Sequence, residues 1–149
     1  MPDTATAAPL AWNDRLLMGY PAMDAEHREF VDLVGALQRA ADDELLPLLE
    51  AFAAHAERHF SSENEWMTET AFPARDCHID EHAAVLRSVA EVRALAEAGN
   101  LALVRSLAAE LARWFPGHAD YLDSALAAWM CKQRWQGQPV VLRRKILQR

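Results

Sequence analysis

The sequence of 149 residues is poor in residues that interrupt helices, with five glycines and seven prolines. Its two cysteines, Cys77 and Cys131, are too few for the disulfide framework of a small secreted domain. No apolar run approaches the roughly 18 residues of a membrane-spanning helix. The first residues contain Asp3 and no basic segment, so we expect no secretory signal. These absences predict a soluble, cytoplasmic protein. Cys77 points about 100° away from its neighbour His78 on a helix, so it is predicted to be a packed thiol, with a redox role as the alternative.

Basic side chains are also in the minority, because 15 Lys and Arg stand against 22 Asp and Glu and give a net charge of −7. All the acidic residues precede residue 130, whereas the segment that follows is purely basic. An acidic body argues against nucleic-acid binding, which needs a basic face. The basic and partly apolar tail over 136–149 has two interpretations. It is either an extension lying on the acidic body or an amphipathic contact for a partner protein or an anionic surface.

Apolar residues make up 52% of the chain, which suffices for one well-filled domain, and the abundance of Ala and Leu favours helices. Apolar positions at three- and four-residue spacing predict four helices. They run from about 24 to 40, from 42 to a break at 70–73, from about 74 to a break at 99–100, and from 101 past 129. Short connections make neighbouring helices antiparallel.

The predicted fold class is therefore all-α, an up-down-up-down antiparallel four-helix bundle with an N-terminal arm and a C-terminal extension. We expect the arm over 1–20, the bundle over 21–135 and the basic tail over 136–149. Trp12 is expected to anchor the arm, and Pro47 to lie in the first turn of the second helix. Asp24 is expected to cap the first helix, with a role as hydrogen-bond acceptor for His27 as the alternative. His55, one turn before His59, is interpreted either as a core or rim residue or as a residue that supports a ligand or controls access to the site.

Candidate metal ligands occur on every predicted helix. Two pairs are four residues apart, which places both members on one helical face. A third pair, His118 and Asp123, is five residues apart, which predicts a π-type widening of the last helix. Burying so many imidazoles and carboxylates without a metal is very costly. The candidates are His27, His59, Glu63, His78, His82, His118 and Asp123.

The donor set predicts two ions, because seven side chains exceed what one ion accepts. Imidazole together with carboxylate suits iron, zinc, copper, nickel or manganese, whereas magnesium and calcium prefer oxygen ligands. If both carboxylates and one solvent-derived oxygen bridge the ions, one position of two octahedral shells is left open. Five imidazoles divide three and two, so the open position belongs to the ion with two. Such a site suits one small diatomic ligand.

The order of these residues closely resembles the hemerythrin family in its bacterial form. The matching segments are MGYPAMDAEH (18–27), HFSSE (59–63), HIDEH (78–82) and HADYLD (118–123), preceded by Trp12. The resemblance implies a non-haem centre of two Fe ions joined by an oxo or hydroxo group, with Glu63 and Asp123 as further bridges. His78, His82 and His118 would complete the coordination shell of one iron. His27 and His59 would leave the other open to O2.

The resemblance also implies reversible O2 binding, for storage, delivery or scavenging, without enzymatic activity. Neutral imidazoles in place of further anions should stabilise Fe(II), which favours ligation over oxidation. The alternatives are a sensor of O2, NO or redox state and, less favoured, a di-iron peroxidase or NO-reducing enzyme. The chain is expected to be a monomer or a weak oligomer. Candidate residues for the lining of the O2 pocket are Phe30, Phe60, Trp114 and Phe115.

Overall fold

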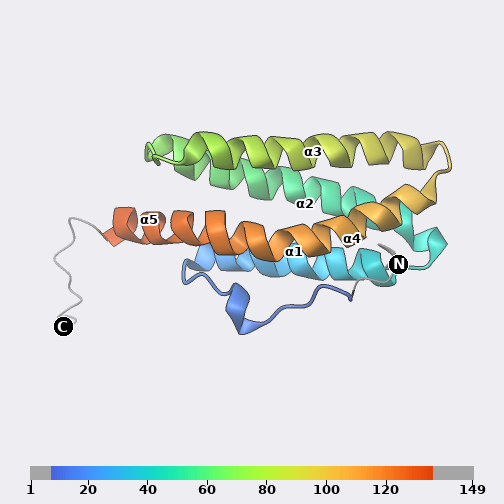
Figure 1. Ribbon diagram of the computed structural model, residues 1–149, viewed down its shortest axis with the longest axis horizontal. Coiled ribbons are helices and arrows are strands. Elements are labelled where there is room, and N and C mark those ends of the chain that lie inside the picture. Colours follow the sequence, from blue (N-terminus) through green and yellow to red (C-terminus); the bar gives the residue numbers. More distant parts are fainter. Residues whose placement is uncertain (1–7, 136–149) are drawn as a thin grey trace.

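The computed structural model describes residues 8–135, which form an antiparallel four-helix bundle. The first three rods are α1 (Pro21–Arg39), α2 (Asp42–Glu69) and α3 (Arg75–Glu97). The fourth rod is continuous and consists of α4 (Leu101–His118), η3 (Ala119–Asp123) and α5 (Ser124–Trp135). Figure 1 shows α2 and α3 side by side above α1 and the fourth rod, and each rod contacts its neighbours in sequence. The predicted all-α bundle is confirmed.

The first helix starts three residues earlier than predicted. Pro21 occupies its first position, which suits proline because the N–H that it lacks has no partner there, and Tyr20 is the N-cap residue. Asp24 therefore lies inside α1, and its carboxylate accepts hydrogen bonds from the N–H groups of Met18 (2.7 Å) and Gly19 (3.0 Å). The prediction that Asp24 caps the helix was wrong. The side chain instead fastens the preceding segment to α1.

The position expected for Pro47 was also wrong. Because α2 begins at Asp42, Pro47 lies in the second turn, inside the helix. The N-terminal end is capped by Glu44, whose carboxylate accepts a hydrogen bond of 2.8 Å from the Ala41 N–H. Pro47 offers no N–H to the carbonyl of Asp43, which lies in the exposed first turn, where water satisfies such groups.

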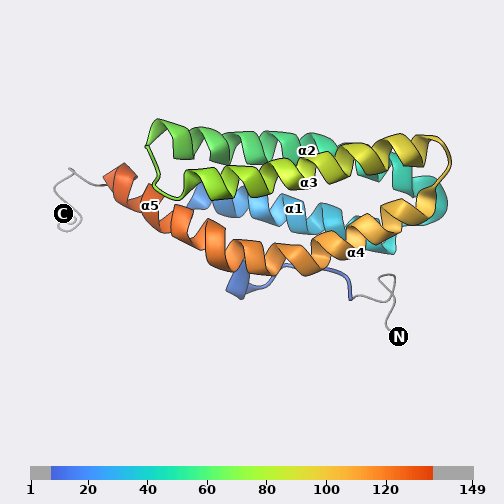
Figure 2. The ribbon, with the colours of Figure 1, turned by 45° about the horizontal axis from the view of Figure 1, so that its top comes forward.

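The fourth rod contains the widening that the five-residue spacing predicted. Its backbone is π-helical over Ala119–Asp123, and the Ser124 N–H bonds to the Ala119 carbonyl five residues back. The helix continues through Pro116, one turn before this segment. Figure 2 shows the whole rod curving along the bundle.

Two apolar clusters fill the bundle. The larger one contains the fully buried rings of Phe30, Phe52, Phe60 and Phe115. The smaller one, around Met67 and Leu126, lies on residues near the end where α2 turns into α3. The bundle also buries a set of histidine, glutamate and aspartate side chains, which are taken up below.

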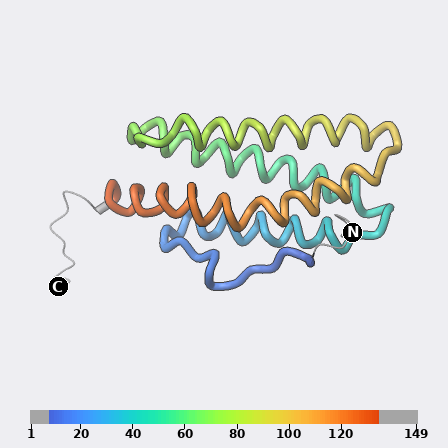
Figure 3. Tube along the Cα trace, in the orientation of Figure 1, coloured from blue at the N-terminus to red at the C-terminus, as the bar shows by residue number. Residues whose placement is uncertain are grey.

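The part of the N-terminal arm over 8–20 runs along the bundle (Figure 3), and its residues Leu10, Trp12 and Met18 pack against the larger cluster. It contains a short 3-10 helix, η2 (Asp14–Leu16), and Trp12, which packs on the larger cluster with the guanidinium of Arg28 4.3 Å from its ring. The Leu10 N–H donates to Gln38 Oε1 at 2.7 Å. Gly35 permits this close approach, because a Cβ there would lie 2.6 Å from the Leu10 carbonyl oxygen. The predicted anchoring by Trp12 is confirmed.

Within residues 8–135, no helix has the length and apolar character needed to cross a bilayer. The predicted basic tail over 136–149 lies outside the described residues, so both of its interpretations stay predictions.

Replacing Gly35 with alanine should lower the free energy of unfolding by about 1–3 kcal/mol, because the arm must move away from the new Cβ. Urea denaturation would measure the change. Gly117→Ala is the matched control, since no heavy atom lies within 4 Å of its Cβ position. That variant should gain roughly 0.5–1 kcal/mol from its lower chain entropy. Equal effects of the two substitutions would contradict the close contact.

Candidate metal centre

The structure brings all seven predicted ligands together in the interior. Each rod of the bundle contributes at least one, and none is more than 5% exposed. The pairs spaced by four residues present their side chains from one face of α2 and one face of α3, as the helical repeat requires. The converging side chains are His27, His59, Glu63, His78, His82, His118 and Asp123.

The two oxygens of Glu63 face different histidines. Oε2 lies 2.9 Å from His59 Nε2 and 3.5 Å from His27 Nε2. Oε1 lies 3.3 Å from His82 Nε2 and 3.6 Å from His78 Nε2. The carboxylate therefore stands between two groups of imidazoles.

The two oxygens of Asp123 also face different groups of imidazoles. Its Oδ2 lies 3.0 Å from His27 Nε2, whereas Oδ1 lies 3.0 Å from His78 Nε2 and 3.3 Å from His118 Nε2. Two groups of donor atoms result, and each contains one oxygen from each carboxylate. We call the group with His27 and His59 the two-imidazole sub-site. The three-imidazole sub-site is the group with His78, His82 and His118.

The π-helical segment is what allows Asp123 to take part. In a regular α-helix, side chains five residues apart point about 140° away from each other. The wider turn over η3 reduces this angle, so Asp123 and His118 approach each other within the same cluster.

Most of the converging atoms have no hydrogen-bond partner within the described part of the chain. They include Nε2 of His27, His78, His82 and His118 and both carboxylate oxygens of Asp123. The atoms are close but misaligned for hydrogen bonds, and each unsatisfied buried group costs about 1–3 kcal/mol. Donor atoms bound to one ion at about 2.0–2.2 Å lie about 2.8–3.6 Å apart, from octahedral to tetrahedral geometry. The cluster therefore has the chemistry and spacing of a metal-binding site.

Comparison with known proteins agrees with this geometry. Residues 18–130 match the family model described as the hemerythrin HHE cation binding domain. The chain belongs to the hemerythrin family. It is 39% identical over 124 residues to the bacteriohemerythrin of Ralstonia nicotianae, covering 83% of this chain and 90% of that protein. It is 29% identical over 125 residues to the bacteriohemerythrin of Stenotrophomonas maltophilia, with 79% of each chain covered.

Two ligand candidates of this hemerythrin-family chain are oriented by neighbours that the sequence reasoning missed. His82 Nδ1 donates to Asn64 Oδ1 at 2.8 Å, and His118 Nδ1 donates to Glu81 Oε1 at 2.7 Å. Because Nδ1 carries the proton, Nε2 keeps a lone pair toward the cluster. Trp114 Nε1 donates to the same Glu81 oxygen at 3.1 Å. Glu81 and Asn64 each adjoin a ligand candidate in the sequence, which is the one signal that pointed to them.

Two of the four predicted pocket aromatics flank the two-imidazole sub-site. The Phe115 ring stands edge-on to His27, with centroids 5.1 Å apart, and Phe30 stands edge-on to His59 at 5.9 Å. Phe30 and Phe115 also stack on each other at 4.6 Å. Both are fully buried, so they shield this side of the cluster from water.

The other two predicted aromatics stack on the three-imidazole sub-site. Phe60 lies parallel to His82, with centroids 4.1 Å apart and an angle of 6° between planes. Trp114 stacks on His118 at 4.2 Å. These contacts fix the planes of the two rings and so the directions of their nitrogens.

In the absence of metal, the carboxylates and imidazoles of the cluster shift one another's pKa values. Burial raises the pKa of Asp123, but the close imidazoles, led by His118, outweigh burial and hold it well below its usual range. The pKa of Glu63 is lowered in the same way, against both burial and the charge of Asp123. Burial lowers the pKa of His27, yet Asp123 and Glu63 raise it overall to about 9. The pKa of His82 is lowered, chiefly by burial.

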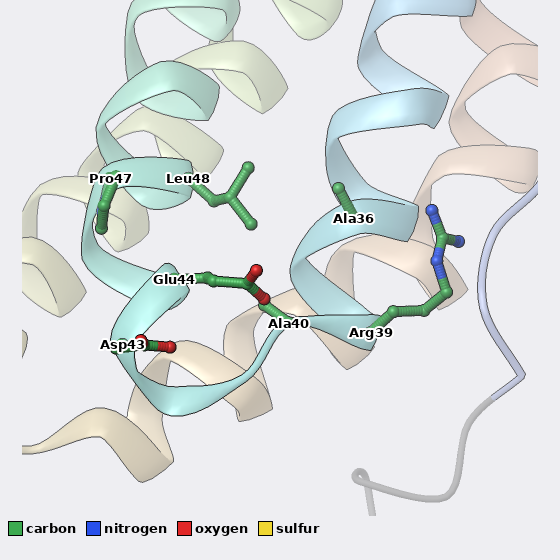
Figure 4. Close-up of a pocket in the computed structure, with 7 residues that line it drawn as sticks. All are labelled: Ala36, Arg39, Ala40, Asp43, Glu44, Pro47 and Leu48. Carbon is green, nitrogen blue, oxygen red and sulfur yellow. The ribbon is translucent and has the colours of Figure 1, made fainter.

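Other polar groups considered in the sequence lie outside the cluster. His55 is buried, as predicted, but faces Glu26 and Glu29. Cys77 is exposed, so its prediction as a packed thiol was wrong, because the first turn of α3 turns it to solvent. Figure 4 shows a groove where α1 meets α2, in which Glu44 acts as the helix cap described above.

The metal-free protein should lose stability as the pH rises from 6.5 to 9. His27 binds a proton more tightly when folded, so its contribution is complete below pH 6.5 and vanishes as the pH passes about 9. The loss should be about 3 kcal/mol at most. Urea denaturation with a chelator present, at several pH values, measures it. His27→Gln should flatten this dependence, and an unchanged slope in that variant would refute the assignment to His27.

Proposed function

We propose that this chain binds O2 reversibly at a centre of two iron ions and serves in O2 storage, delivery or scavenging, without catalysing a reaction. The division of Glu63 and Asp123 between two unequal groups of imidazoles carries the proposal. The names of the two bacteriohemerythrin relatives support it. Sensing of O2 has the same site requirements but no separate observation in its favour.

Each bridging carboxylate would hold both ions, because it presents one oxygen to each sub-site. His27 and His59 would hold one ion, and the three-imidazole sub-site would hold the other. When bound, the two ions supply an open coordination position and the electrons that O2 takes up on binding. The sub-site with fewer imidazoles is the one we propose for O2.

The surrounding residues support binding over turnover. Phe30 and Phe115 exclude water beside His27 and His59, which disfavours loss of electrons to solvent.

We also propose a cytoplasmic location and a monomeric or weakly associating state. The two cysteines are both free thiols, which supports a reducing compartment. The acidic composition supports repulsion between copies of the chain.

Reversibility is the decisive test. Protein loaded with iron and reduced without oxygen should gain an optical band when O2 is admitted and lose it under argon, over repeated cycles. A Raman band that shifts with isotopically labelled O2 would show that the gas itself is bound. Metal analysis should give two irons per chain. Irreversible oxidation on first exposure, or a single iron, would refute the proposal.

The contact of Glu81 with His118 should matter for metal affinity. Glu81→Ala removes the acceptor of the His118 Nδ1–H and should weaken metal binding roughly 10–100-fold. Glu81→Gln keeps an oxygen acceptor and should weaken it less. Competition with a chelator measures the affinity, and Glu91→Ala, an exposed position on α3, is the control. Equal affinities of the Glu81→Ala and Glu91→Ala proteins would contradict this role.

A further inference from the structure

A second polar cluster lies between α1 and α2, on the outer side of the two-imidazole sub-site. A surface groove of about 580 Å³ runs between these helices, and His55 is among the residues that line it. Its charged lining residues are Glu29, Asp32 and Arg58, so negative charge is in excess. The groove therefore attracts cations toward a buried imidazole.

The polar atoms at the base of this groove are not satisfied by one another. His55 is 1% exposed, and neither of its ring nitrogens has a hydrogen-bond partner among residues 8–135. His55 Nδ1 lies 3.0 Å from Glu29 Oε1 and 3.8 Å from Glu26 Oε1. Glu26 Oε1 is buried and also lacks a partner in this part of the chain. A simple ion pair between His55 and Glu29 would leave the Glu26 oxygen unsatisfied.

This cluster adjoins the metal centre. The His55 and His59 rings have centroids 5.3 Å apart. One donor atom each from Glu26, His55 and His59 lie within 4.8 Å of one another. An ion held by Glu26 and His55 would thus be a short step from His59, a candidate ligand of the inner cluster.

We propose that Glu26, Glu29 and His55 form an outer site for a divalent transition-metal ion, through which ions pass from the groove to His59. The proposal rests on the function proposed above for the inner cluster. Two carboxylates offset the charge of a divalent ion, and carboxylate with imidazole suits Fe(II), Mn(II), Co(II) or Zn(II). The 3.0 Å between His55 Nδ1 and Glu29 Oε1 lies within the range of about 2.8–3.6 Å for two ligands on one ion. Water entering from the groove would complete the coordination shell.

The first test counts Zn(II) ions by calorimetry on metal-free protein. Wild-type protein should bind two ions tightly and a third more weakly. The variant E26Q/E29Q should bind the two tight ions and lose the third, since it keeps the size of both side chains but removes two ligands. Both residues are at least partly exposed on α1, so the fold should tolerate the change. H55Q should lose the third ion as well.

The matched control is E57Q/E97Q, which removes the same charge from two carboxylates near Arg93 of α3. It should keep the third ion. Three ions in E26Q/E29Q, or two in wild-type protein, would overturn the outer site while leaving the inner one intact. Failure of wild-type protein to bind any ion tightly would instead refute the function proposed for the inner cluster.

The second test concerns the route. Co(II) uptake by metal-free protein, followed by stopped-flow absorbance, should be roughly tenfold slower in E26Q/E29Q than in wild-type protein. The final cobalt content of the inner cluster should be unchanged. Equal rates in the two proteins, or equal slowing in E57Q/E97Q, would overturn the route, because general surface charge would then account for the attraction of ions.

Discussion

The burial of two carboxylates among five imidazoles is the constraint on which this bundle depends. An isolated carboxylate in a protein interior is very unfavourable, yet Glu63 and Asp123 are at most 1% exposed. They are tolerated because imidazoles from every rod surround them. Each rod must therefore bring its ligand candidate to the same level of the bundle, which fixes the register of the four helices along the common axis.

The unequal sharing of imidazoles follows from the topology of the chain. The hairpin of α1 and α2 supplies His27 and His59, whereas α3 and the fourth rod supply the other three histidines. One carboxylate comes from each half, Glu63 from α2 and Asp123 from η3, and each reaches across to the opposite half. Ions held by these groups would tie the two halves together. The outer polar cluster belongs to the α1–α2 half alone.

The faces of the helices that carry the ligand candidates could be predicted from their spacing, because helical geometry is regular. Four residues return a side chain to the same face, and the five-residue step from His118 foretold the π-helical segment. Details that depend on competition between neighbouring groups could not be foreseen. Asp24 was a plausible cap, but Pro21 starts the helix before it. The role of Glu81 depends on a rotamer and on a partner 37 residues away.

The extra residue in η3 limits how the length of this segment can change. Its outward side chains are free to change, since Tyr121 is 79% exposed. Removing one residue between His118 and Asp123 would leave them four residues apart, a spacing that a regular helix also places on one face, whereas one further residue would make the spacing six and turn the two donors apart. Over evolutionary time this stretch can therefore accept new amino acids at its surface, or lose its extra residue, but it cannot accept a further insertion.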